Sequence, residues 1–280
     1  EDRYEDVQIL FGWKFPEQLF ARMPYLRWIQ NLSVCIEAFI NNPDIDSTVQ
    51  VTNTGRLYGD TIAEYVIWAM ITLSRRFHRT IHNQRRRRWQ QVFGPSLSGR
   101  TVGIAGLGDV GLNVAALSAA HGMKTLGIVR PNQLDQSFDH VSRLVSIEDL
   151  DSVVGDCDAL VLSLPLTDQT HGLINEELIG RMHSESILIN TARAEIADQS
   201  AIIRAVRNGT IAGAALDVFD KEPLRRWDPV WSVDNILVTP HTSSMSTEYK
   251  TRVADLIQQN MIRFVDGRPL INEIDRERGF

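Results

Sequence analysis

Three residues in the second half of the chain have the side chains needed to reduce a carbonyl group with transfer of a proton. Arg193, Glu222 and His241 each follow a short apolar run that is typical of a buried strand. An arginine can hold a carboxylate through its planar fork of donors and can stabilise a developing alkoxide. A histidine can give or take a proton near neutral pH, and a glutamate beside it stabilises the charged ring and fixes its orientation. Together with a hydride donor, this set suits the reduction of a 2-oxo acid.

A glycine-rich loop earlier in the chain has the pattern that binds the phosphates of a dinucleotide. It matches G-x-G-x-x-G, follows the apolar run Thr101–Ala105 and opens an Ala-rich helical stretch. Gly106 permits a tight turn, Gly108 lets the backbone approach a pyrophosphate, and Gly111 lets the helix pack closely on the strand. The helix N-terminus adds unpaired N–H groups and the positive end of the helix dipole. The expected cofactor residues in this loop are Gly106, Leu107, Gly108, Asp109, Val110 and Gly111.

The position after the second strand selects among nicotinamide cofactors. A cofactor with a free ribose 2′-hydroxyl usually meets an Asp or Glu about 20 residues after the glycine loop. Between Leu112 and Leu134 the sequence has neither, and Arg130 follows Val129 at the expected place. Without a carboxylate there is no repulsion toward a 2′-phosphate, and a guanidinium can bind that group through two hydrogen bonds. The sequence therefore favours NADP(H), while NAD(H), with a solvated loop arginine at this position, is the open alternative.

The elements that must position these residues follow a regular order after residue 95. Six apolar runs predict buried parallel strands, and helical stretches separate most of them. One of these helices is predicted at Gln199–Asn208, between the cap residue Asp198 and Gly209. This alternation is typical of an α/β fold with a doubly wound Rossmann-type parallel sheet, whose ligands collect at the carboxyl ends of the strands. The predicted strands are Thr101–Ala105, Lys124–Val129, Ala159–Leu164, Ile187–Asn190, Ile211–Leu216 and Ile236–Thr239.

The first third of the chain has a different pattern, with short apolar runs between turns. A capping box at Thr61-x-x-Glu64 predicts the start of one long helix, whose apolar side chains repeat every three to four residues as far as Ile81. The turn-rich segment 94–99 follows and is taken as the junction between two domains. The strands predicted before the long helix are Val7–Phe11, Leu26–Ile29 and Thr48–Thr52.

The composition narrows the possible partners and settings. The 280 residues include 29 Lys and Arg against 35 Asp and Glu, and a net charge of −6 argues against a general binder of nucleic acid or membrane surfaces. The sequence shows no stretch suited to a transmembrane helix and no signal peptide, so a cytoplasmic protein is expected. Two cysteines, Cys35 and Cys157, are too few for a disulfide scaffold or a zinc cluster, and no metal site is expected.

The chain carries five motifs in order: Thr101–Gly111, Leu164–Thr167, Asn190–Arg193, Leu216–Pro223 and Thr239–Ser243. This ordered set resembles the D-isomer-specific 2-hydroxyacid dehydrogenases, a family that includes glyoxylate/hydroxypyruvate reductases and phosphoglycerate dehydrogenases. The resemblance covers nearly the whole chain. It implies an oxidoreductase that transfers hydride between NAD(P)(H) and a small 2-oxo acid or D-2-hydroxy acid.

The resemblance also implies a role for each site residue. His241 would be the acid/base, Glu222 its partner, and Arg193 the residue that orients the substrate and polarises its carbonyl. The substrate carboxylate would bind backbone amides near Val34 and Cys35, where the family usually has a glycine in place of the cysteine. The residues expected along the cofactor are Asp217, at the nicotinamide carboxamide, and Pro165 and Thr191.

The same resemblance predicts the domains and the assembly. Residues 1–94 and 266–280 would form a flavodoxin-like substrate domain, and residues 95–265 the dinucleotide-binding domain. Compared with the family, the sequence starts after the first strand and helix of the substrate domain, so the natural protein is expected to be longer. The family also implies a homodimer built around the cofactor domains.

Three questions stay open at this level. The run Arg85–Arg88 would suit nucleic-acid binding, but one basic segment in an acidic chain favours a solvated helix end near a subunit interface. The alternative function is a nucleotide-sensing scaffold that resembles the C-terminal-binding-protein corepressors and has little turnover, since such proteins share the fold and the three catalytic-type residues. The side chain of the 2-oxo acid is not specified by any motif.

Overall fold

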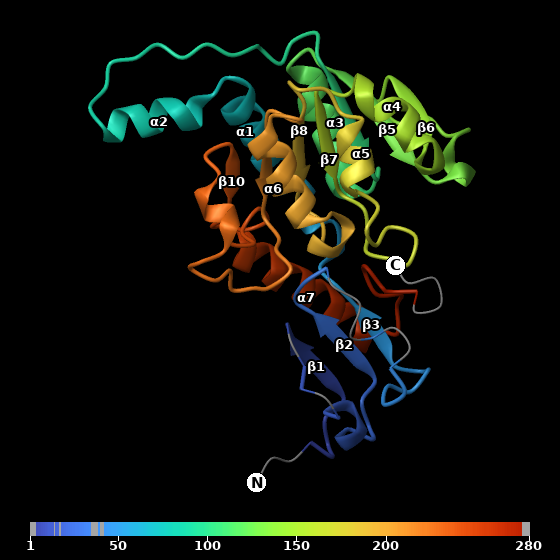
Figure 1. Ribbon diagram of the computed structural model, residues 1–280. Coiled ribbons are helices and arrows are strands. Elements are labelled where there is room, and N and C mark those ends of the chain that lie inside the picture. Colours follow the sequence, from blue (N-terminus) through green and yellow to red (C-terminus); the bar gives the residue numbers. More distant parts are fainter. Residues whose placement is uncertain (1–3, 14, 17, 35–38, 40–41, 276–280) are drawn as a thin grey trace. The chain divides into compact units, whose positions relative to one another are not determined.

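The computed structural model divides the chain into two compact units. It describes residues 4–13, 15–16, 18–34, 39 and 42–275. The smaller unit comprises residues 1–57 and 246–280, and the larger unit residues 58–245 (Figure 1). These divisions lie elsewhere than the sequence-based boundaries at 94 and 265, because the long helix after residue 58 packs within the larger unit and the last helix packs within the smaller one.

The larger unit is built on a seven-stranded sheet in which every strand runs parallel to its neighbours. Its strands are β4 (Thr101–Ala105), β5 (Lys124–Val129), β6 (Arg143–Ser146), β7 (Ala159–Leu162), β8 (Ile187–Asn190), β9 (Gly213–Leu216) and β10 (Ile236–Val238). Their order is β10-β9-β8-β7-β4-β5-β6, so the chain starts in the middle of the sheet, builds one side and then returns to build the other. The predicted doubly wound, Rossmann-type parallel sheet is confirmed.

Helices connect these strands and cover both faces of the sheet. They are α3 (Asp109–Ala120), the short α4 (Leu150–Val153), α5 (Glu176–Gly180) and α6 (Gln199–Asn208). Right-handed crossovers place α3 on one face and α5 and α6 on the opposite face, because the strand order reverses at β4. The ends of α6 are those that the sequence predicts: the Asp198 side chain accepts from the Ala201 amide at 2.9 Å, and Gly209 ends the helix with a φ of 74°.

Strand β6 has no counterpart among the predicted strands. It is an edge strand in which Arg143 is exposed, Leu144 is half-buried and only the last two residues are buried. Because only two of its residues are buried, β6 has no continuous apolar run in its sequence, and such a run is the pattern that predicts a buried strand.

The single long helix predicted from the capping box is wrong in two respects. Helix α1 (Gly59–Ser74) begins two residues before Thr61, whose side chain does not cap it. A break then separates α1 from α2 (Phe77–Arg85), because Arg76 adopts the left-handed conformation with a φ of 57°. The apolar spacing continues across the break, yet Phe77 and Ile81 are exposed on α2 instead of buried.

The smaller unit contains a three-stranded parallel sheet of order β1-β2-β3 and the last helix. These elements are β1 (Ile9–Gly12), β2 (Trp28–Asn31), β3 (Gln50–Thr52) and α7 (Tyr249–Val265). Asn260 on α7 is fully buried; its Nδ2 donates to Gln30 Oε1 at 3.1 Å and its Oδ1 accepts from the Ile271 amide at 2.7 Å. These bonds join the end of the chain to the N-terminal sheet, and Ile274 completes the apolar core of this unit.

Candidate active site

The turn between β4 and α3 has the geometry that a pyrophosphate requires. Gly106 has a φ of 95°, in the region that favours glycine, and its amide donates to the Ile128 carbonyl at 3.0 Å. A Cβ on Gly111 would collide with the Gly106 carbonyl oxygen, so only glycine lets α3 begin so close to the turn. A Cβ on Gly108 would meet no atom within 4 Å, so the space beside this backbone is open to a ligand. The loop therefore fits the dinucleotide that its sequence predicts.

Contacts within the protein place the other residues of this loop. Leu107 is buried, and one of its methyl carbons lies 2.7 Å from the position of a Cβ added to Gly127, so it packs against β5. The Asp109 carboxylate accepts a hydrogen bond from the Gly59 amide at 2.9 Å and thereby joins the starts of α3 and α1. Since that side chain is engaged by α1, the groups that Asp109 and Val110 can offer to a phosphate are their backbone amides.

Three further cofactor residues predicted from the sequence follow three strands of the sheet. Arg130 comes directly after β5 and is exposed. Pro165 follows β7, and its carbonyl accepts from the Thr170 hydroxyl at 2.7 Å. Thr191 follows β8, and its hydroxyl donates to the Leu162 carbonyl at 3.3 Å. Because the strands are parallel, these residues lie at the same edge of the sheet as the glycine loop.

The register of the last three strands sets the positions of the catalytic candidates. Asn190 pairs with Leu216, and Leu216 pairs with Val238, so the ends of β8, β9 and β10 are level. Arg193 follows the end of β8 by three residues and is half-buried; its Nη1 donates to the Ala192 carbonyl at 2.9 Å. The side chain of Asn190 donates to the Arg193 carbonyl at 3.0 Å and so fixes the backbone that presents the guanidinium.

The structure brings His241 and Glu222 into direct contact. His241 Nδ1 lies 2.8 Å from Glu222 Oε2, and the other oxygen of Glu222 accepts from the Phe219 amide at 3.1 Å. The two side chains are 49% and 38% exposed, so the pair is open to a ligand. With Nδ1 held by the carboxylate, Nε2 is the ring nitrogen that can exchange a proton with a substrate.

Asp217, the residue expected at the nicotinamide carboxamide, is buried, with 1% of its surface exposed. Its contact with a cofactor stays a prediction from the family resemblance. Its Oδ1 accepts from the Thr239 hydroxyl at 2.6 Å and from the Thr242 amide at 2.8 Å, and its Oδ2 accepts from the Ser243 amide at 2.9 Å. The donors come from both sides of His241, so Asp217 clamps the loop that carries the histidine. Thr239 is not among the site residues predicted from the sequence, although a threonine between the last apolar strand and Pro-His is a visible signal.

The residues expected to bind the substrate carboxylate belong to the smaller unit. Val34 is 40% exposed, and its carbonyl accepts from the Asn53 side chain at 3.3 Å. Cys35 lies outside the described residues. The role of this turn therefore stays a prediction from the family resemblance.

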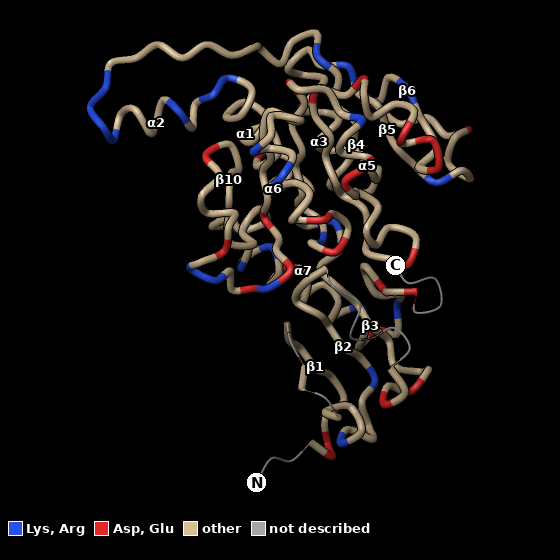
Figure 2. The backbone as a smooth tube through the Cα atoms, viewed as in Figure 1, with Lys and Arg blue, Asp and Glu red and all other residues tan. Residues whose placement is uncertain are grey.

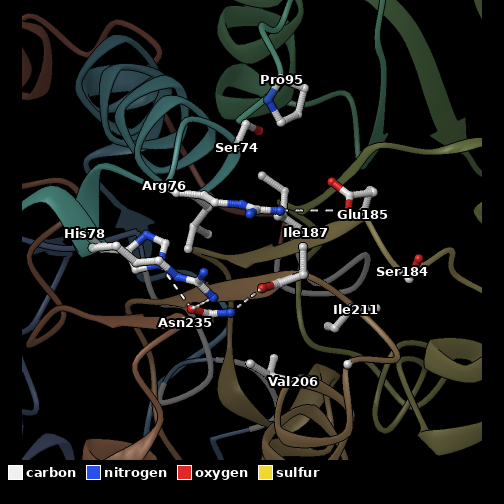
Figure 3. A pocket seen from close by; sticks show the side chains of 14 residues that line it. Ser74, Arg76, His78, Pro95, Ser184, Glu185, Ile187, Val206, Ile211 and Asn235 are labelled. Carbon is white, nitrogen blue, oxygen red and sulfur yellow. Dashed lines mark hydrogen bonds and ion pairs between the residues drawn. The ribbon is translucent and has the colours of Figure 1, made fainter. Parts of the chain in front are cut away.

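A separate hollow of about 150 Å³ lies near the opposite edge of the sheet. Figure 3 shows Arg76 reaching toward Glu185, at 4.0 Å, and His78 beside Asn235, at 3.1 Å. Its lining includes Ile187, the first residue of β8, whereas ligands of open parallel sheets bind beyond the carboxyl ends of the strands. This hollow is therefore not the candidate active site.

Two other kinds of feature are missing from the described part of the chain. No group of three or more His, Cys, Asp or Glu residues there is arranged to hold a metal ion. None of its helices combines the length and apolar character needed to cross a bilayer.

An open parallel sheet with a phosphate-type glycine loop and a His–Glu pair at its carboxyl edge defines a dinucleotide-binding protein of the dehydrogenase class. Residues 67–243 match the family described as "D-isomer specific 2-hydroxyacid dehydrogenase, NAD binding domain". The chain belongs to the D-isomer specific 2-hydroxyacid dehydrogenase family, as the sequence motifs predicted.

Similar proteins agree with this assignment. The glyoxylate reductase of Aeropyrum pernix is 32% identical over 273 residues, which cover 92% of this chain and 79% of the relative. A D-isomer specific 2-hydroxyacid dehydrogenase from Xanthobacter autotrophicus, solved with NADPH and MES, is 33% identical with a TM-score of 0.86, covering 100% of this chain and 87% of that one. An NADPH-dependent glyoxylate/hydroxypyruvate reductase from Sinorhizobium meliloti, solved with NADP and sulfate, is 26% identical with a TM-score of 0.88, covering 100% and 88% of the two chains.

The glycine loop yields a paired prediction. Gly108→Ala should leave the thermal unfolding midpoint close to that of the parent, because its Cβ enters open space, but should weaken binding of NADPH about tenfold or more by filling the place of the pyrophosphate. Gly111→Ala should instead lower the free energy of unfolding by about 1–3 kcal/mol, because its Cβ collides with backbone. Calorimetry and fluorescence titration measure the two effects, and equal binding by parent and Gly108→Ala would contradict the placement of the pyrophosphate.

Proposed function

We propose that this protein is a reductase of small 2-oxo acids that prefers NADPH, with His241 as acid/base, Glu222 as its partner and Arg193 as the substrate anchor. The observation that carries the proposal is the 2.8 Å contact between His241 and Glu222, at the sheet edge where the glycine loop fits a pyrophosphate. Relatives named glyoxylate reductases support a small 2-oxo acid as substrate.

The protein's own residues supply the proton donor and the groups that orient the substrate, but not the hydride. Bound NADPH supplies the hydride that reduces the carbonyl carbon of the substrate. His241 donates a proton from Nε2 to the carbonyl oxygen, while Glu222 holds Nδ1 and so fixes the ring orientation and stabilises its charged form. The Arg193 guanidinium pairs with the substrate carboxylate and places positive charge beside the oxygen that becomes an alkoxide. In the oxidation of a 2-hydroxy acid, the same histidine accepts the proton.

Substitution of the two proposed catalytic residues tests this function. His241→Ala and Arg193→Ala should each lower kcat/KM for glyoxylate or hydroxypyruvate by at least about 100-fold, because the proton donor or the substrate anchor is lost. NADPH binding should be retained. The measurement is the consumption of NADPH absorbance, with His171→Ala, at an exposed histidine, as the matched control.

The same assay separates the alternative function. If the parent consumes no NADPH with any 2-oxo acid in a panel, the nucleotide-sensing scaffold becomes the better account. If both variants keep the full rate with every acid that the parent reduces, the roles of His241 and Arg193 are wrong.

The preference for NADPH is assigned to Arg130. This exposed residue follows β5, and the segment from Leu112 to Leu134 has no carboxylate that would repel a 2′-phosphate. Arg130→Ala should raise the KM for NADPH about 10- to 100-fold through the loss of a charge-assisted bidentate contact and should leave the KM for NADH nearly unchanged. A parallel change in both KM values would show that Arg130 does not read the 2′-phosphate.

We also infer that the larger unit pairs with a second copy of itself. Figure 1 shows an arm, made of α2 and the extended segment after it, that stands away from the sheet. In Figure 2 basic residues lie along α2 and at the turn that ends it, whereas the extended segment 89–99 carries none. On this arm the side chain of Trp89 is fully exposed and that of Phe93 is 78% exposed, so neither is buried against the rest of the larger unit. An apolar groove between α1, α2 and α3, lined by Trp68, Phe77 and Leu117, offers a surface of matching character. Large exposed apolar patches of this kind are typical of protein interfaces.

Light scattering after size exclusion tests the pairing. The parent should elute as a dimer, and Trp89→Asp should weaken the dimer by a factor of about 30 or more, as expected for a buried interface tryptophan. Trp227→Asp is the control, since Trp227 is equally large and 77% exposed but lies outside the arm. A monomeric parent would contradict the inference.

A further inference from the structure

A threonine hydroxyl links α1 to the loop that carries His241. The Thr239 hydroxyl donates to Asp217 Oδ1 at 2.6 Å and lies 2.9 Å from the Tyr65 hydroxyl. Tyr65 belongs to α1, and Thr239 directly follows β10. Three side chains from a helix, a strand end and a buried loop position therefore form one continuous hydrogen-bonded chain.

The number of available hydrogens decides which hydroxyl donates in each of these hydrogen bonds. A threonine hydroxyl has a single hydrogen, and that of Thr239 is given to Asp217. Tyr65 is therefore the donor in its bond with Thr239. Burial is the largest cause of a raised pKa for the Tyr65 phenol, and the nearby Asp217 carboxylate adds to it against the opposite effect of the Thr239 hydrogen bond. The phenol consequently keeps its hydrogen throughout the pH range in which such an enzyme works.

Asp217, the acceptor at the end of this row of hydrogen bonds, holds the backbone on both sides of His241. The Asp217 carboxylate accepts hydrogen bonds from the Thr239 hydroxyl, before the histidine in sequence, and from the amides of Thr242 and Ser243, after it. His241 itself has a φ of 54°, in the left-handed region, and its amide donates to the Thr239 carbonyl at 3.0 Å. This conformation is uncommon for any residue other than glycine, and contacts with the surrounding structure stabilise it here. The Asp217 clamp therefore holds the backbone from which the imidazole projects, while Glu222 holds the ring itself.

We propose that Tyr65 is a positioning residue for His241, because its hydroxyl orders the Thr239 hydroxyl and thereby the Asp217 clamp. This inference rests on the proposed function, in which His241 is the acid/base. Tyr65 acts on the reaction only through Thr239 and Asp217. Without its hydroxyl, the Thr239 side chain has a choice of rotamers, the clamp loosens, and a smaller fraction of molecules has His241 aligned. The chemical step slows while the binding of cofactor and substrate is unaffected.

The ring of Tyr65 has a separate, structural role that the test must leave intact. It lies against the Trp68 ring, with centroids 5.3 Å apart and planes inclined by 48°. Tyr65→Phe keeps this ring contact and removes the hydroxyl alone. Thr239→Val removes the middle hydroxyl, and Thr239→Ser keeps it. Tyr25→Phe, at a tyrosine that is 65% exposed, is the matched control for the loss of a phenolic hydroxyl.

The experiment combines kinetics with hydrogen exchange on the full chain. Tyr65→Phe should lower kcat with glyoxylate about 3- to 10-fold, with the KM values for glyoxylate and NADPH within about twofold of the parent. The amides of Thr242 and Ser243, followed by NMR, should exchange faster by a similar factor. Thr239→Ser should retain most of the parent kcat. Tyr65→Phe/Thr239→Val should have the same kcat as Thr239→Val alone, since Tyr65 acts through that hydroxyl.

The outcomes separate this inference from the proposed function. An unchanged kcat in Tyr65→Phe overturns the positioning role, and so does an unchanged exchange rate at both amides. A double variant whose losses add overturns the route through Thr239. If the parent reduces no 2-oxo acid, the proposed function fails, and the exchange rates alone then decide whether Tyr65 orders the His241 loop.

Discussion

The parallel direction of all seven strands is the constraint on which the rest of the larger unit depends. Because every strand points the same way, every strand-to-helix connection that carries chemistry opens at one edge of the sheet. The glycine loop after β4, Arg130 after β5, Arg193 after β8 and His241 after β10 are separated by up to 135 residues in sequence, from Gly106 to His241, but share that edge. The ends of β8, β9 and β10 are level. Asp217 and Glu222, which follow β9, can therefore form hydrogen bonds with the loop after β10 that carries His241.

Much of this fold can be predicted from the sequence, because buried parallel strands leave continuous apolar runs. The strands at Thr101–Ala105, Lys124–Val129 and Ile187–Asn190 match their predicted bounds, and α6 lies between the Asp198 and Gly209 signals that predicted it. The elements that the sequence did not predict correctly differ for local structural reasons. Strand β6 has only two buried residues and so no continuous apolar run. The break between α1 and α2 depends on one arginine in a left-handed conformation, which no apolar spacing reveals.

The site is only partly predictable, for a related physical reason. Residue types at strand ends point to Arg193, Glu222 and His241, because the fold brings strand ends together. The hydrogen bonds among them depend on the path of each turn. The sequence contains no sign that the Asp217 carboxylate accepts three donors from the loop around His241, or that Tyr65, more than 150 residues earlier, reaches the same loop. These contacts join elements that are distant in the chain, and only the three-dimensional structure reveals them.

The bond between Asp109 and Gly59 has an electrostatic consequence for the glycine loop. A carboxylate at the start of α3 carries a charge of the same sign as a pyrophosphate and would repel it. Here that carboxylate is turned to the first amide of α1, a helix of 16 residues whose positive end compensates the charge. Gly59 allows this approach because a Cβ there would overlap the carboxylate. One helix terminus thus neutralises the acid, and the terminus of α3 keeps its positive potential for the anion that the loop is built to receive.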